Sequence, residues 1–117
     1  MMQKKSFNTP DETRTPPKTK VEVINIGGGT LLRSTFEPGW KWSDHVKPTA
    51  GTESCQVHHV IYAISGQLKV VMNDGTEMEV NPGDVVDIPA GHDAWVVGDE
   101  AVVGIDFGNS ATYAKAP

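Results

Sequence analysis

The chain carries five side chains that could bind a transition metal, four histidines and a single cysteine. They are His45, His58, His59, His92 and Cys55. Imidazole nitrogens and thiolates suit zinc, nickel, copper and iron. His92 directly follows the turn residues Pro-Ala-Gly and precedes a short apolar run. That position suits a metal ligand, an acid–base group near neutral pH or a packed core side chain.

The elements that must position these side chains are predicted to be short strands. Runs rich in β-branched residues are separated by turn residues about every eight to twelve positions. The clearest unit is a hairpin in which Asp74-Gly75 joins two strands, because Asp-Gly favours a two-residue turn. We predict strands at residues 21–26, 30–36, 55–65, 67–73, 76–80, 85–88, 94–97 and 101–107. Residues 40–46 also alternate as in a strand, and no segment shows a convincing helical period. The pattern predicts an all-β domain, closed or sandwiched, whose mouth can hold one small ligand.

Composition and charge narrow the classes of partner. Residues 1–20 carry a net charge of +3, contain three prolines and are almost free of apolar side chains, which predicts a flexible N-terminal tail. Residues 21–117 carry −8 and are predicted to form a single domain. An acidic domain does not favour nucleic acid, and no apolar run is long enough for a membrane partner. The lone Cys55 and the polar start predict a cytoplasmic protein.

Two stretches resemble the sequence motifs of the cupin superfamily. Residues 81–95, NPGDVVDIPAGHDAW, are similar to the second motif, a Gly followed after five residues by Pro-x-Gly and, after two more, by a His. Residues 59–70, HVIYAISGQLKV, look like the strand that leads into the closing Gly of the first motif, here Gly66. The resemblance spans about residues 21–110. It implies a cupin double-stranded β-helix, that is a jelly-roll barrel, with a divalent metal often held at its mouth.

The first motif can be aligned in two ways. With Pro38-Gly39 as the lead-in, His45 and Lys47 fall on the His-x-His pair that supplies two metal ligands in the family. With the usual spacing, Glu53 and Cys55 fall there instead. His59 stands where the family has a Glu, seven residues before the closing Gly.

The second motif lacks its usual ligand, because Ala94 occupies the His position. His92 is two residues earlier, so on a strand it points to the same side as Ala94. His59 takes an inward position with Ile61, and His58 then faces outward.

We therefore expect His45, His59 and His92 to converge inside the barrel, with Cys55 nearby. Such a cluster could bind zinc, iron, nickel, copper or manganese and leave one position to water. The alternative is that these histidines are structural, because Lys47 cannot replace an imidazole ligand. Cupins also shape their pockets with aromatic rings, which makes pocket candidates of Trp40, Trp42 and Trp95.

Two classes of function remain open. The first is a metal-dependent enzyme acting on a small organic ligand, an oxidoreductase such as an oxygenase or an isomerase, with unknown catalytic residues. The second is a non-catalytic small-molecule-binding or sensor barrel without metal. By analogy with the fold we expect a homodimer, with residues 21–26 as the first candidate for an edge strand that pairs across it.

Overall fold

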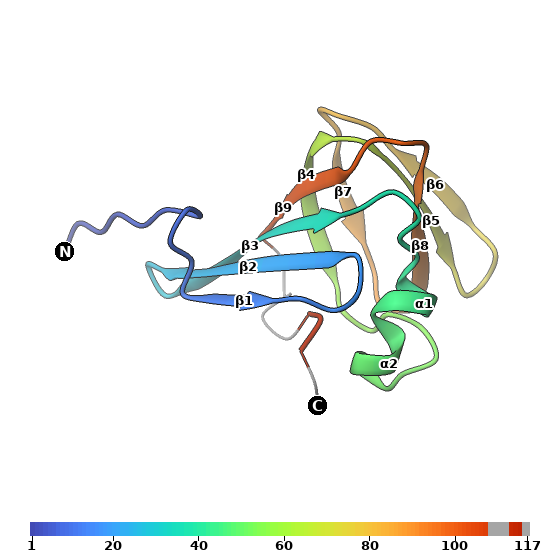
Figure 1. The fold of residues 1–117 in the computed structure, drawn as a ribbon, viewed down its shortest axis with the longest axis horizontal. Helices are drawn as coiled ribbons and strands as arrows, with labels where there is room; N and C mark the ends of the chain where they lie inside the picture. Colours follow the sequence, from blue (N-terminus) through green and yellow to red (C-terminus); the bar gives the residue numbers. More distant parts are fainter. Residues whose placement is uncertain (108–112, 116–117) are drawn as a thin grey trace.

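The computed structural model describes residues 1–107 and 113–115, in which two antiparallel sheets face each other (Figure 1). The larger sheet has the strand order β1-β2-β3-β9-β4-β7, and the smaller has the order β6-β5-β8. The strands are β1 (Glu12–Arg14), β2 (Thr19–Ile26), β3 (Gly29–Phe36), β4 (His59–Ser65), β5 (Gln67–Met72), β6 (Glu77–Val80), β7 (Val85–Ile88), β8 (His92–Val97) and β9 (Val102–Asp106). This architecture confirms the prediction of an all-β jelly roll.

The alternation of side chains along the strands determines what lies inside. On β4, His59 and Ala63 are buried while Tyr62 is exposed. On β8, His92 and Ala94 are both buried. The strand-parity predictions for these positions are therefore confirmed.

The core lies between the sheets and is closed at one end by aromatic rings. The indole of Trp40 stacks on Phe36 with ring centroids 3.9 Å apart. Its Nε1–H donates to the Thr19 hydroxyl over 2.8 Å, so the polar edge of this buried ring is satisfied. The main apolar contributors from both sheets are Val21, Val23, Leu32, Leu68, Val70, Val80, Val96 and Val102.

Residues 40–46 are not a strand, contrary to the alternation seen in the sequence. Two short helices, α1 (Trp42–His45) and α2 (Lys47–Ala50), occupy this region instead. Trp42 and Val46 are buried at a spacing of four, while Asp44 between them is exposed, which fits a helical turn. Such a short element has too few residues to show a period. Among the residues described, no helix is long and apolar enough to cross a membrane.

The N-terminal segment expected to be flexible contributes a strand to the larger sheet. β1 pairs antiparallel with β2, and Arg14 at its end is buried. Because β2 is paired with β1 on one side and β3 on the other, the expectation that residues 21–26 form an edge strand is wrong. The division of the chain at residue 20 and the homodimer both stay predictions.

Gly66 makes the tight link between β4 and β5, the point where the chain passes from one sheet to the other. Its φ is 73°, and a Cβ there would lie 2.5 Å from the carbonyl oxygen of Ala101. At Gly75 φ is 91°, but a Cβ would meet nothing within 4 Å. We expect Gly66→Ala to lower the free energy of unfolding by about 3 kcal/mol, and Gly75→Ala by about 1 kcal/mol, because only the first adds a backbone clash to the strain of positive φ. Urea unfolding measures both, and equal losses would contradict this role for Gly66.

Candidate metal centre

Three potential metal ligands meet inside the barrel. They are Cys55, His59 and His92, all buried, and one ligand atom from each lies within 4.8 Å of the others. The Cys55 Sγ is 3.6 Å from the Nε2 of His59. The rings of His59 and His92 meet edge to face, with centroids 5.4 Å apart.

Backbone pairing brings the cysteine beside β8. The Cys55 N–H donates to the carbonyl of His92 over 2.8 Å, and the Gly91 N–H donates to the carbonyl of Cys55 over 2.7 Å. These bonds form an isolated antiparallel bridge between Cys55 and His92. The left-handed Gly91, with φ of 92°, lets the chain turn into β8 at this point.

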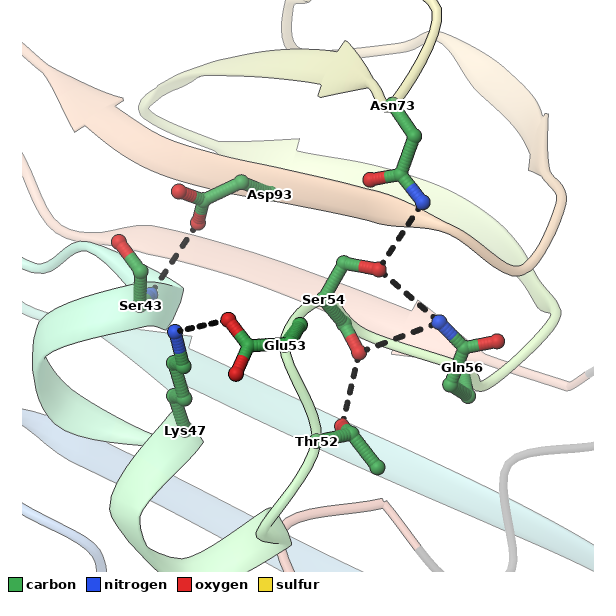
Figure 2. A network of polar contacts seen from close by, with 8 residues as sticks. All are labelled: Ser43, Lys47, Thr52, Glu53, Ser54, Gln56, Asn73 and Asp93. Atoms are coloured by element: carbon green, nitrogen blue, oxygen red, sulfur yellow. Dashed lines mark hydrogen bonds and ion pairs between the residues drawn. The ribbon is translucent and has the colours of Figure 1, made fainter.

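A polar network holds the segment that carries Cys55, as Figure 2 shows. The Ser54 hydroxyl accepts hydrogen bonds from the side-chain amides of Gln56 and Asn73, over 2.9 and 3.2 Å. The Thr52 hydroxyl donates to the Ser54 carbonyl over 2.8 Å. Asp93 accepts from the Ser43 N–H over 3.1 Å, which joins α1 to β8. The residues on either side of Cys55, Ser54 and Gln56, are therefore held by hydrogen bonds, and this limits the movement of the thiol between them.

Both imidazoles are oriented by hydrogen bonds at Nδ1. The His59 Nδ1 bonds to the carboxylate of Asp106, and the His92 Nδ1 lies 2.7 Å from the carbonyl oxygen of Pro89. A carbonyl can only accept, so the His92 Nδ1 carries the proton and the lone pair of the neutral ring is on Nε2. The carboxylate imposes the same tautomer on a neutral His59. Metal-bound histidines are held through their second nitrogen in this way.

Burial keeps the thiol and the His92 imidazole uncharged at neutral pH. Loss of solvent raises the pKa of Cys55 to about 11 and lowers the pKa of His92 to about 4. The Asp106 and Asp93 carboxylates add a smaller upward effect on the pKa of the thiol. A cation that replaced the thiol proton would therefore meet a neutral imidazole with its lone pair available.

The donor set and its spacing fit a tetrahedral metal. Zinc binds sulfur at about 2.3 Å and imidazole nitrogen at about 2.0–2.1 Å, which places two such ligands about 3.5 Å apart on a tetrahedron. The Cys55–His59 separation of 3.6 Å matches that edge. Three protein ligands leave a fourth position, as in catalytic zinc sites.

Two cavities meet at the cluster. The two histidines and Asp106 are among the residues that line the inner cavity, whose volume is about 20 Å³. The outer groove has a volume of about 440 Å³, and Cys55 is among the residues that line it. Trp42 and Tyr113 belong to both walls, so they separate the two spaces.

Sequence reasoning missed two residues of this site, Asp106 and Tyr113. Asp106 ends the apolar strand β9 at an inward position, and an acid in such a run was a signal for a buried partner. Tyr113 had no signal, since it reaches the site from the C-terminal end of the chain. Its backbone carbonyl accepts a hydrogen bond from the buried Arg14 guanidinium over 2.7 Å.

The structure brings together Cys55, His59 and His92 of the four predicted metal ligands, but not His45. The His45 Nδ1 lies 3.0 Å from the Lys41 N and 3.1 Å from the Lys41 O, on α1. The alignment with the usual motif spacing puts Cys55 at a ligand position of the motif, and the structure places Cys55 beside His59 and His92. Its other residue, Glu53, is exposed and pairs with Lys47 over 3.2 Å.

Of the three tryptophans predicted to line a pocket, two line the inner cavity and one does not. Trp40 and Trp42 line the inner cavity. Trp95 does not line either of the two spaces, and the Lys41 ammonium lies 5.5 Å from the centre of its ring. His58, predicted to face outward, is exposed and pairs with Asp87 over 2.6 Å.

Comparison with known proteins identifies the architecture. No protein-family model and no curated protein matches the chain. A protein of unknown function from Rhizobium leguminosarum bv. viciae 3841 has a similar structure, with a TM-score of 0.61 and 22% identity over 92% of this chain and 97% of that one. KdgF from Halomonas sp. gives 0.57 and 16% over 84% and 87%. A cupin-like protein from Thermotoga maritima MSB8 gives 0.56 and 18% over 88% and 76%. The resemblance seen in the sequence motifs is confirmed, and this chain has the cupin fold.

Proposed function

We propose that Cys55, His59 and His92 bind one divalent transition metal, with zinc the best fit. The meeting of three ligand atoms within 4.8 Å of one another supports this most strongly, because both rings are already held through Nδ1. Thiolate and imidazole together favour zinc, copper, nickel or iron over the oxygen-preferring manganese. Zinc takes the tetrahedral geometry that the 3.6 Å separation matches.

We further propose that the metal site serves an enzyme that acts on a small organic molecule. A metal with three protein ligands can polarise an oxygen of a bound carbonyl or enol compound, which is the chemistry of an isomerase or an oxidoreductase. Of the chain's own groups, Asp106 orients His59, and the rings of Trp42 and Tyr113 line the space around the site.

A non-catalytic binding barrel is the second candidate. The observation that favours it is that the inner cavity has few polar groups beyond the cluster residues themselves, namely Ser34, Asp106 and Tyr113. Chelation separates the two candidates. Binding of a small ligand would survive removal of the metal in a barrel that does not use one, and the metal-dependent site would lose it.

The first test is the metal content of the protein purified without a histidine tag. We expect close to one metal per chain in the wild type, measured by elemental mass spectrometry. Cys55→Ala, His59→Ala and His92→Ala should each lose most of it, because each removes one of three ligands. His45→Ala and His58→Ala are matched controls outside the cluster and should keep it. Equal metal content in all five variants would contradict the proposed site.

The second test is the effect of pH on zinc affinity. The Cys55 thiol has a pKa of about 11 and must lose its proton on binding, while His92, with a pKa of about 4, has already lost its own. Lower proton concentration favours the metal-bound form, so affinity should rise at least about tenfold per pH unit between about pH 6 and 8. Competition with a chromophoric chelator, corrected for the chelator's own protonation, gives the slope. In Cys55→Ala the slope should fall by about one, and a pH-independent affinity in the wild type would refute thiolate ligation.

The third test concerns the carboxylate behind His59. We expect Asp106→Asn to lower zinc affinity about 10- to 100-fold, because it removes the charge that orients the imidazole and makes it a better ligand. Asp87→Asn, which alters the exposed partner of His58, is the matched control and should leave affinity unchanged. An unchanged affinity in Asp106→Asn would show that the carboxylate has no part in metal binding.

A further inference from the structure

The Tyr113 hydroxyl is a buried polar group without a partner among the residues that the structure describes. Tyr113 is 4% exposed, and its side chain makes ring contacts with His59 and Phe36. Buried hydroxyls in folded proteins almost always have a hydrogen-bond partner. An unpaired one beside a candidate metal centre therefore points to a missing ligand.

Neighbouring side chains hold Tyr113 in place. Its ring meets His59 edge to face, with centroids 4.7 Å apart, and meets Phe36 in the same way at 6.4 Å. The Arg14 guanidinium holds its carbonyl. Tyr113 lines the inner cavity together with His59 and His92 and the outer groove together with Cys55, so its side chain lies beside the candidate metal ligands.

The sizes of the two spaces decide where an organic ligand can bind. The inner cavity, at about 20 Å³, has room for about one water molecule. The outer groove, at about 440 Å³, is in the range of small-molecule sites and includes the face of the cluster that carries Cys55. An organic ligand must therefore approach from the groove and pass Tyr113 to reach the metal.

The lining of the groove indicates the chemistry of that ligand. Half of the lining residues are apolar, namely Trp42, Val46, Ala50, Val57 and Ala114, and Thr52 and Gln56 add neutral polar groups. Lys115 supplies a positive charge, and a dication bound to one thiolate carries a net charge of +1. An apolar body with a single anionic head satisfies both features, and the phenol O–H can donate to that head.

We propose that Tyr113 donates a hydrogen bond to the head group of a small apolar carboxylate, which enters through the outer groove and takes the open metal position. This inference rests on the proposed metal site. It makes Tyr113 a binding and positioning residue, and it gives the groove, rather than the inner cavity, the role of the ligand site.

The test uses cobalt-loaded protein, whose visible spectrum reports a change in the metal's ligands. Benzoate joins an apolar ring to one carboxylate, acetate lacks the ring, and benzamide lacks the charge. We expect benzoate to change the spectrum saturably and to bind at least tenfold more tightly than either of the others. In Tyr113→Phe its affinity should fall about tenfold or more, because a hydrogen bond to a charged group is lost, while cobalt affinity stays within about twofold.

Two further variants make the result decisive. Tyr62→Phe alters a tyrosine on the outer face of the barrel and should leave benzoate binding unchanged. Ala50→Phe fills the groove and should weaken benzoate but not acetate. Unchanged benzoate binding in Tyr113→Phe, or loss of cobalt binding in that variant, would overturn the inference and leave the metal site standing. Failure of the wild type to bind cobalt would overturn the proposed function and the inference with it.

Discussion

The buried hydrogen bond between His59 and Asp106 is the interaction on which the rest of the site depends. It joins β4 to β9, which are neighbouring strands in the larger sheet, and Asp106 is only 2% exposed. A carboxylate at that depth is stable only with partners, so the imidazole is held against it. That contact turns the Nε2 of His59 towards the thiol of Cys55. The other two side chains are held separately, Cys55 by its backbone bonds to β8 and His92 by the Pro89 carbonyl.

Burying the polar groups of this cluster costs desolvation free energy, which apolar residues at the same positions would not cost. A thiol, two imidazoles, a carboxylate and a phenol are buried among aromatic and aliphatic side chains, where apolar residues of similar volume would pack without desolvation. Burial holds Cys55 protonated, and only a bound cation makes its thiolate favourable there. Such a buried group of donors differs from an ordinary apolar core, and its residues could hold a metal ion.

The sequence predicted the strands and part of the site because both follow from local spacing. The period of two along residues 55–65 placed His59 inside, and the two-residue offset from Ala94, the family's ligand position, placed His92 inside. The Asp-Gly turn located a hairpin. The helix α1 escaped prediction because four residues are too few to show a period. The polar partners at Asp106 and Tyr113 escaped because the contacts they make span 47 and 99 residues of chain. Spacing alone left both His45 and Cys55 as candidates, and it could not reveal the backbone bridge that places Cys55 beside His92.

X-ray absorption spectroscopy of the zinc-loaded protein tests the central claim most directly, because it counts the ligand atoms around the metal. The account predicts one sulfur at about 2.3 Å and two imidazole nitrogens at about 2.0–2.1 Å, with one further light atom. The sulfur contribution should vanish in Cys55→Ser. A shell made only of oxygen and nitrogen in the wild type would contradict the account, since it would place the metal away from Cys55.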